Sequence, residues 1–211
     1  MGNYNLTSHA RQYRLLNAHT VSEHAMNIYS VFDNEEVGSR SRQGADSSFF
    51  RDTLERAAAS LGLSLSEFRQ AIAESFVLSA DNAHAVHPAH PDKYDPVNQP
   101  QMNGGPVIKY NAAQKYTTDA VSAAVFKTIC KKADVPFQEF TNNSDIAGGS
   151  TLGNLLNATF PAATVDIGLA QLAMHSPYES AGAKDPEYLS KAVAAFYDSE
   201  IRMENDGISI R

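Results

Sequence analysis

Apolar and polar positions follow two different periods along the chain, and stretches of the two kinds alternate. A period near 3.6 predicts amphipathic helices, whereas strict alternation or a short apolar run predicts strands. The predicted helices cover residues 8–19, 49–59, 64 to just before 76, 118–132, 151–156 and 185 to about 203. The predicted strands cover residues 28–32, 76–78, 106–110, 137–140 and 163–167.

Local signals mark several helix ends. Gly62 is expected to end the second helix, and Ser64 with Glu67 three residues on is typical of a capping box that begins the third. Asp185 and Pro186 have the residue types of an N-cap and first helical position, so they predict the start of the last helix.

The alternation of strands and helices predicts an α/β layered domain with a mostly parallel sheet flanked by helices. Residues 86–105 are rich in proline and lack periodicity, so we expect a long loop there. No internal repeat or low-complexity segment interrupts the pattern. We therefore expect residues 1–211 to form a single domain.

Composition excludes several classes of protein. The chain has 43% hydrophobic and 19% charged residues, which is typical of a soluble globular protein. Its one cysteine, Cys130, excludes a scaffold built on internal disulfides. The net charge of -7 argues against nucleic acid as a partner. No apolar run is long enough to span a membrane and no secretory signal is visible, so we expect a cytoplasmic protein with no membrane partner.

Ionisable residues follow three of the predicted strands. Residues 33–39 (DNEEVGS) follow the first strand, residues 79–87 (SADNAHAVH) the second, and residues 174–176 (MHS) come soon after the last. Ligand sites of α/β sheets lie at the carboxyl ends of the strands, so we expect these residues to share one site. Each stretch alone is more often a solvated loop or a hydrogen-bonded structural residue. Their coincidence favours a zinc or manganese site, because Asp, Glu and His are ligands of both metals.

The adjacent Glu35 and Glu36 suit a division of labour in hydrolysis. One carboxylate binds the metal, while the other holds the attacking water and relays its proton to the leaving amine.

Four motifs together resemble the M18 metallopeptidases, the aspartyl aminopeptidase family. They match in order and spacing over nearly the whole chain from about Asn5. The motifs are residues 33–39 continuing to 43–47 (QGADS), 79–88 (SADNAHAVHP), 105–109 (GPVIK) and 171–176 (QLAMHS).

The resemblance implies a zinc-aminopeptidase-like catalytic domain that removes N-terminal, mainly acidic, residues from peptides. It implies two zinc ions per site, with manganese or cobalt as alternatives. Glu35 would be the general base and acid, and the metal ligands would be Glu36, Asp81 and His175. The implied substrate-binding residues are His84, His87, Lys109, Asp145 and Gly149. A cationic Lys109 suits an acidic side chain, although an exposed lysine at a strand end is the alternative, and Gly148 and Gly149 could simply turn the chain into a helix.

The sequence departs from the family at two metal ligands. Tyr4 stands where the family has the aspartate that bridges both metals, and the family's upstream zinc histidine and inserted domain have no counterpart here. His9 and His19 lie in no matching motif. We therefore expect an incomplete domain, with little or no peptidase activity in this polypeptide alone.

Three hypotheses remain open. The chain is the carboxyl-terminal catalytic portion of an aminopeptidase, a truncated paralogue that acts through subunit contacts, or one half of a split enzyme. Peptides are the expected substrates. Homo-oligomerisation, or association with a missing half, is expected because an incomplete layered domain should expose apolar surface.

Overall fold

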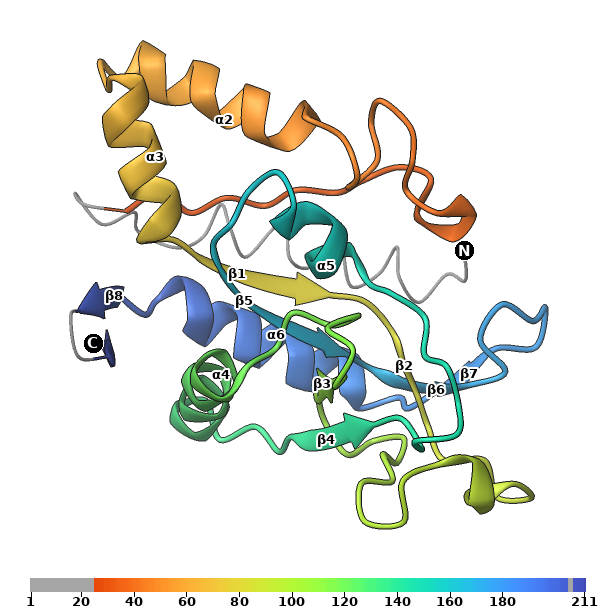
Figure 1. The fold of residues 1–211 in the computed structure, drawn as a ribbon. Coiled ribbons are helices and arrows are strands. Elements are labelled where there is room, and N and C mark those ends of the chain that lie inside the picture. Colours follow the sequence, from red (N-terminus) through yellow and green to blue (C-terminus); the bar gives the residue numbers. More distant parts are fainter. Residues whose placement is uncertain (1–24, 205–206) are drawn as a thin grey trace.

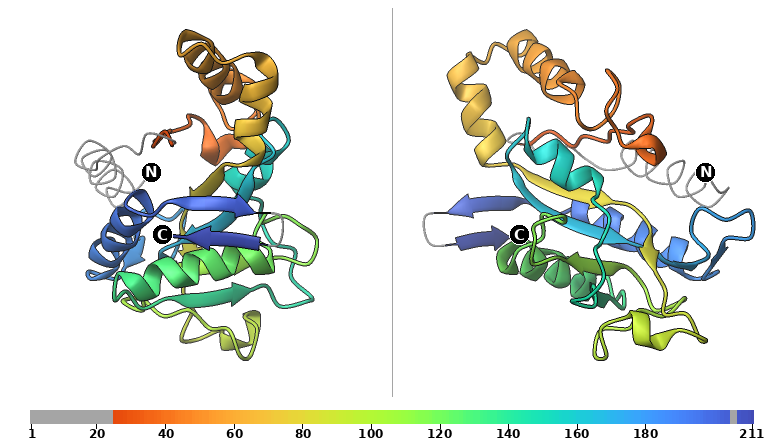
Figure 2. Two further views of the ribbon diagram at one scale, coloured as in Figure 1. Left: turned by 90° about the vertical axis from the view of Figure 1, so that its left-hand side faces the viewer. Right: turned by 45° about the vertical axis from the view of Figure 1, so that its right-hand side comes forward.

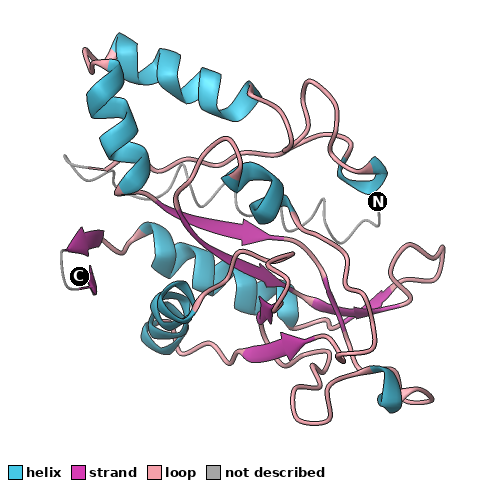
Figure 3. Ribbon diagram, viewed as in Figure 1, coloured by secondary structure: helices cyan, strands magenta, loops and turns pink. Residues whose placement is uncertain are grey.

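The computed structural model describes residues 25–204 and 207–211, in which helices flank β-sheets (Figure 1 and Figure 3). The helices are η1 (Glu35–Val37), α2 (Phe49–Ser60), α3 (Leu65–Ala73), η2 (Pro91–Lys93), α4 (Ala120–Lys132), α5 (Leu152–Asn157) and α6 (Asp185–Tyr197). The strands are β1 (Phe76–Ala80), β2 (Ala83–His84), β3 (Val107–Tyr110), β4 (Gln138–Thr141), β5 (Ala163–Gly168), β6 (Ala170–Leu172), β7 (Ser180–Ala181), β8 (Ile201–Glu204) and β9 (Gly207–Ile210). The predicted helix at 8–19, Tyr4, His9 and His19 lie outside the described residues.

The main sheet has the strand order β1-β5-β3-β4. β1 pairs parallel with β5, and β3 pairs parallel with β4, whereas β5 and β3 are antiparallel. A second sheet, β2-β6-β7, continues from the ends of β1 and β5, because β2 and β6 follow these strands closely in the chain. The predicted mostly parallel sheet is therefore confirmed, with one antiparallel pairing inside it.

Helices cover both faces of the main sheet (Figure 1 and Figure 2). On one face, Val165 and Ile167 of β5 pack with Phe126 of α4 and Leu189 of α6 in the largest apolar cluster. On the other face, β5 presents Asp166, whose side chain is bonded to Thr151 just before α5. A second cluster joins α2, α3 and α5 beyond this face. The period of two along β5 thus separates an apolar layer from a layer that holds polar groups.

The local signals for α3 are confirmed. Ser64 caps the helix through the capping box with Glu67, with the Glu67 amide donating to Ser64 Oγ at 3.3 Å and the Ser64 amide donating to Glu67 Oε2 at 2.7 Å. α2 ends at Ser60, just before Gly62. The long loop at 86–105 holds only the short η2.

The predicted strand at 28–32 is wrong: residues 25–32 form no strand. The end of α6 supplies polar contacts to this segment, since the Tyr197 hydroxyl donates to the Ile28 carbonyl at 3.3 Å. Phe32 packs against Phe50 of α2, with ring centroids 5.8 Å apart. The alternating apolar residues at 28–32 therefore belong to a loop that packs against α2 and α6.

The predicted limits of the last helix are also wrong. α6 ends at Tyr197 instead of about 203, because Ile201 and Met203 alternate with more exposed neighbours and form β8, which pairs with β9. Lys184 is the N-cap and Asp185 the first helical residue. The Asp185 carboxylate instead accepts from the amides of Asn103, at 2.7 Å, and Gly105, at 3.0 Å.

Within the described ranges, no helix has both the length and the apolar character needed to cross a bilayer.

Candidate active site

A short turn places the two adjacent glutamates. η1 lies between Asn34 and Gly38, both with left-handed backbone at φ of 60° and 96°. Asn34 Nδ2 donates to Ser41 Oγ at 2.9 Å, which ties the turn to the chain that follows it. Asn tolerates this conformation better than most residues, so the local sequence suits the turn. The turn presents Glu35 half-buried and Glu36 partly exposed.

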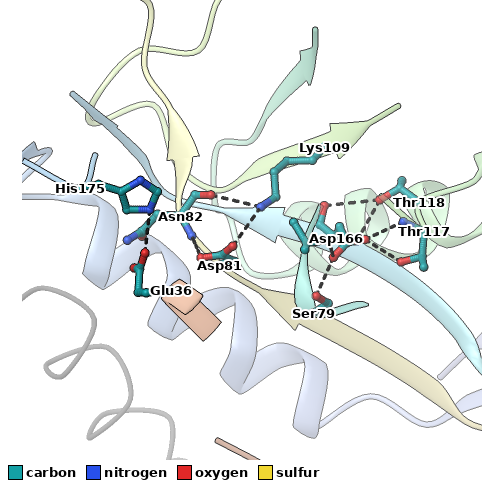
Figure 4. A network of polar contacts seen from close by, with 10 residues as sticks. Glu36, Ser79, Asp81, Asn82, Lys109, Thr117, Thr118, Asp166 and His175 are labelled. Carbon is teal, nitrogen blue, oxygen red and sulfur yellow. Dashed lines mark hydrogen bonds and ion pairs between the residues drawn. The ribbon is translucent and has the colours of Figure 1, made fainter. Parts of the chain in front are cut away.

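Glu36 meets His175, although 138 residues lie between them in the chain. Glu36 Oε2 lies 2.8 Å from His175 Nε2 (Figure 4). His175 sits in the loop after β6 with φ of 67°, a conformation that costs a residue with a side chain about 1–3 kcal/mol. Its amide donates to Glu179 Oε1 at 2.9 Å, which helps to hold this loop. The structure thus brings together two of the three predicted metal ligands.

Asp81 and Lys109 form a second ion pair of the site (Figure 4). Asp81 follows β1, and its Oδ2 lies 4.0 Å from Lys109 Nζ. Lys109 Nζ also donates to the Asn82 carbonyl at 3.1 Å and lies 5.3 Å from the centre of the Tyr116 ring. Only 3% of the Lys109 side chain is exposed, so the alternative of an exposed strand-end lysine is wrong.

These side chains line one cavity of about 140 Å³, which we call the central cavity. Its ionisable lining residues are Glu35, Glu36, Asp81, His84, Lys109, His175 and Glu179. Its other polar or small lining residues are Asn82, Ala83, Tyr116, Gly149, Ser150, Thr151 and Gln171, with Phe140 and Met174 as larger apolar ones.

The central cavity perturbs two titratable groups in ways that suit proton transfer. Burial, followed by the negative charges of Asp81 and Glu36, raises the pKa of Glu35 above that of an ordinary glutamate. Partial burial and the charges of Lys109 and His175 lower the pKa of His84. A carboxylate with a raised pKa accepts a proton more readily near neutral pH.

Zinc is a metal that this donor set fits by chemistry. Carboxylate oxygen and imidazole nitrogen are both zinc donors, and the Glu36–His175 pair presents one of each to the central cavity. Across residues 25–204 and 207–211, no group of three or more His, Cys, Asp or Glu side chains is placed to hold a metal ion. The described residues therefore offer part of a coordination shell.

Two predicted substrate-binding residues lie outside the lining of the central cavity. His87 is exposed beyond β2, where its ring lies 5.3 Å from that of His90 and its Nδ1 accepts from the Ala89 amide at 3.2 Å. Asp145 is exposed in the loop after β4. Gly149 does line the cavity, and a Cβ built there would meet no atom within 4 Å.

Tyr116, Gln171 and Glu179 are among the lining residues that have no role in the sequence-based prediction. Gln171 lies inside one of the motifs. A polar residue within an apolar run is a signal that could have identified it as a site residue. Tyr116 and Glu179 lie in loops whose positions depend on the tertiary fold.

A buried carboxylate holds the cavity's supporting elements together (Figure 4). Asp166 is fully buried. Its Oδ1 accepts from the hydroxyls of Ser79, at 2.6 Å, and Thr151, at 2.8 Å. Its Oδ2 accepts from the amide and hydroxyl of Thr117, both at 2.6 Å. These bonds connect β1, the start of α5 and the loop that carries Tyr116.

Known proteins resemble this chain over most of its length. A family model described as Aminopeptidase I zinc metalloprotease (M18) matches residues 5–197. A probable M18 family aminopeptidase 2 of Clostridium acetobutylicum is 47% identical over 190 residues, which are 90% of this chain and 43% of that protein. A probable aspartyl aminopeptidase of Ricinus communis is 40% identical over 181 residues, which are 86% of this chain and 37% of that protein. The chain thus spans less than half the length of these curated relatives.

Solved structures have the same fold. The structure described as the cryo-EM structure of the Ape4 and Nbr1 complex aligns with a TM-score of 0.83 and 37% identity, covering 92% of this chain and 38% of that one. The mApe1 dodecamer of S. cerevisiae aligns with a TM-score of 0.74 and 27% identity, covering 92% and 43% of the two chains.

Proposed function

Because the chain belongs to the M18 family of zinc aminopeptidases, which are hydrolases, we propose that it supplies part of the active site of an aminopeptidase. The single observation that carries this proposal is the convergence of Glu35, the Glu36–His175 pair and the buried Lys109 on the central cavity. We propose further that the substrates are peptides with an acidic N-terminal residue, as the name of the Ricinus communis relative suggests.

Glu35 is the proposed general base. Zinc bound beside it would lower the pKa of a coordinated water. The Glu35 carboxylate is half-buried and has a raised pKa, so it suits taking the proton of the attacking water and passing it to the leaving amine. Glu36 and His175 are the proposed zinc ligands, and Asp81, beside Lys109 in the same cavity, is proposed for a second ion. Manganese and cobalt are alternatives that the same donors could bind.

Glu35→Gln should remove any hydrolysis that the polypeptide performs. The amide cannot accept the proton of the water, so we expect a loss of at least about 100-fold, within the usual contribution of a general base. The measurement is zinc-dependent release of a chromophore from an aspartyl amide. Glu74→Gln is the matched control, because Glu74 is exposed at the end of α3, away from the central cavity. Hydrolysis that survives Glu35→Gln unchanged would contradict the role of Glu35.

The polypeptide alone should hydrolyse slowly. Tyr4 offers a phenol where the family has a bridging carboxylate, and two cations at close range repel without such a bridge. We expect its specific activity on the aspartyl amide to lie at least about 100-fold below that of the Clostridium acetobutylicum relative. A specific activity within tenfold of that relative would overturn this expectation and leave the aminopeptidase proposal intact.

Lys109 is proposed to select the acidic side chain. It is a buried cation at the wall of the cavity, where a substrate carboxylate would form a charge-assisted hydrogen bond worth about 1.5–3 kcal/mol. We expect Lys109→Met to weaken binding of L-aspartate at least about 10-fold and to leave L-leucine within twofold. Isothermal titration checks this, and equal weakening of both amino acids would contradict a charge-selective role.

Two further aspects remain proposals. The dodecameric relative supports homo-oligomerisation of this chain, and a cytoplasmic location is the expectation from its sequence. A truncated paralogue or half of a split enzyme remains the alternative.

A further inference from the structure

Gln171 in β6 carries a buried polar group that the fold leaves unsatisfied. Gln171 is only 3% exposed. Its Nε2 is the one buried side-chain nitrogen or oxygen, among the described residues, without a hydrogen-bond partner. Leaving a buried donor unpaired is unfavourable, so most buried amides are paired. An unpaired one that borders a cavity indicates a ligand.

The backbone fixes the face of the sheet from which this side chain projects. Gln171 pairs in parallel register with His84 of β2, and its carbonyl accepts from the Ala85 amide at 2.9 Å. Registered neighbours place their side chains on the same face of a sheet, so Gln171 and His84 both face the central cavity, which each of them lines. Gln171 and Lys109 therefore line the same cavity.

The chemistry of the wall selects the ligand group. Gln171 Nε2 can only donate, and Lys109 Nζ can only donate. Both are buried, so a group that accepts from both would offset the cost of burying them. A carboxylate has two oxygens and a negative charge, and it meets both requirements. A neutral amide offers one oxygen, and its nitrogen would face a donor.

We propose that Gln171 is a specificity-determining residue whose amide donates a hydrogen bond to the side-chain carboxylate of the substrate's N-terminal residue, beside Lys109. This inference rests on the proposed acidic-peptide function and assigns a second group to the same selection.

The test uses Gln171→Met, which keeps the length of the side chain and removes its hydrogen bonds. The probes are L-aspartate and its isostere L-asparagine, added to the purified chain, with affinity measured by titration. We expect Gln171→Met to weaken L-aspartate binding about 10- to 100-fold, the range for a hydrogen bond to a charged group. L-Asparagine should change less than twofold. Gln70→Met is the matched control, because Gln70 is exposed on α3 and bonded to Glu74.

A second readout separates this role from a structural one. Removing an unpaired buried amide should raise the midpoint of thermal unfolding of the ligand-free chain, so the variant gains stability while it loses ligand. In a ¹⁵N-labelled sample, the side-chain amide signal that disappears in Gln171→Met should shift with L-aspartate.

The outcomes distinguish the two proposals. If Lys109→Met weakens L-aspartate binding and Gln171→Met does not, the role of Gln171 is overturned and the acidic preference stands. Equal weakening of aspartate and asparagine by Gln171→Met also overturns it, because the contact would then be to the ligand's backbone. If the wild-type chain does not prefer aspartate to asparagine, both proposals fall.

Discussion

Asp166→Ala should cost the protein about 3–5 kcal/mol of its free energy of unfolding, because it leaves several donors without their acceptor and each buried unpaired donor costs about 1–3 kcal/mol. The substitution leaves three side chains without their acceptor: Ser79, Thr117 and Thr151. Ser79 and Thr151 are buried, so water does not replace the lost bonds without rearrangement. With a typical stability of about 5–15 kcal/mol, the chain would lose a large share of it.

Cys130 provides the measurement. It is fully buried in α4, and burial raises the pKa of its thiol to about 12, so a thiol reagent should reach it only when the chain opens. Where opening and closing are fast, the labelling rate follows the population of the open form. Each 1.4 kcal/mol is a factor of ten, so Asp166→Ala should accelerate labelling by about two to three and a half orders of magnitude.

The exposed Asp145 gives the control for this experiment. Asp145→Ala removes the same atoms from an exposed loop position, and it should label at the wild-type rate. Asp166→Ala labelling within threefold of wild type would show that the buried network contributes little.

Features encoded by neighbouring residues could be predicted from the sequence. The capping box of Ser64 and Glu67 depends only on residues one turn apart, and it forms as expected. The family motifs placed Glu35, Glu36, Asp81, His84, Lys109 and His175 in one site, and all six line the central cavity. The strand-end rule supported Asp81 and His84, whereas for Glu35 and Glu36 it rested on the strand at 28–32, which does not form. The order and spacing of the motifs indicated which residues distant in the chain meet in the fold. The periodicity of apolar residues does not indicate this.

Features set by distant contacts could not be predicted. The alternation at 28–32 is compatible with a strand, but pairing requires a partner strand, and this segment is packed against α2 and α6 instead. Asp185 has the residue type of an N-cap, yet its carboxylate bonds amides about 80 residues earlier. His87 lies in one of the family motifs and Asp145 lies in the loop after β4. In both places the strand has already ended, and the residue is exposed.

Asp166 and Gln171 show a signal that the sequence analysis did not use. Each is a polar residue with apolar neighbours on both sides, in the runs 165–167 (VDI) and 169–173 (LAQLA). Burying such a group is costly unless a partner is present. For Asp166 the fold supplies the partners, whereas for Gln171 Nε2 we propose that the substrate does.

The central claim is that the Glu36–His175 pair holds zinc beside the Glu35 base. Removing a direct ligand should cost at least as much as removing one of its supporting partners, which typically lowers metal affinity 10- to 100-fold. Glu36→Ala and His175→Ala should therefore each weaken zinc binding by about 100-fold or more. Asp81→Ala should affect this ion less, because Asp81 is paired with Lys109, whereas Glu36 is paired with His175.

The most direct measurement is titration of the purified chain with zinc against a chromophoric chelator. The account predicts saturable zinc binding that is lost in Glu36→Ala and in His175→Ala and is retained in Glu35→Gln and in the exposed-site variant His90→Ala. Zinc binding that is unchanged in both Glu36→Ala and His175→Ala would contradict it.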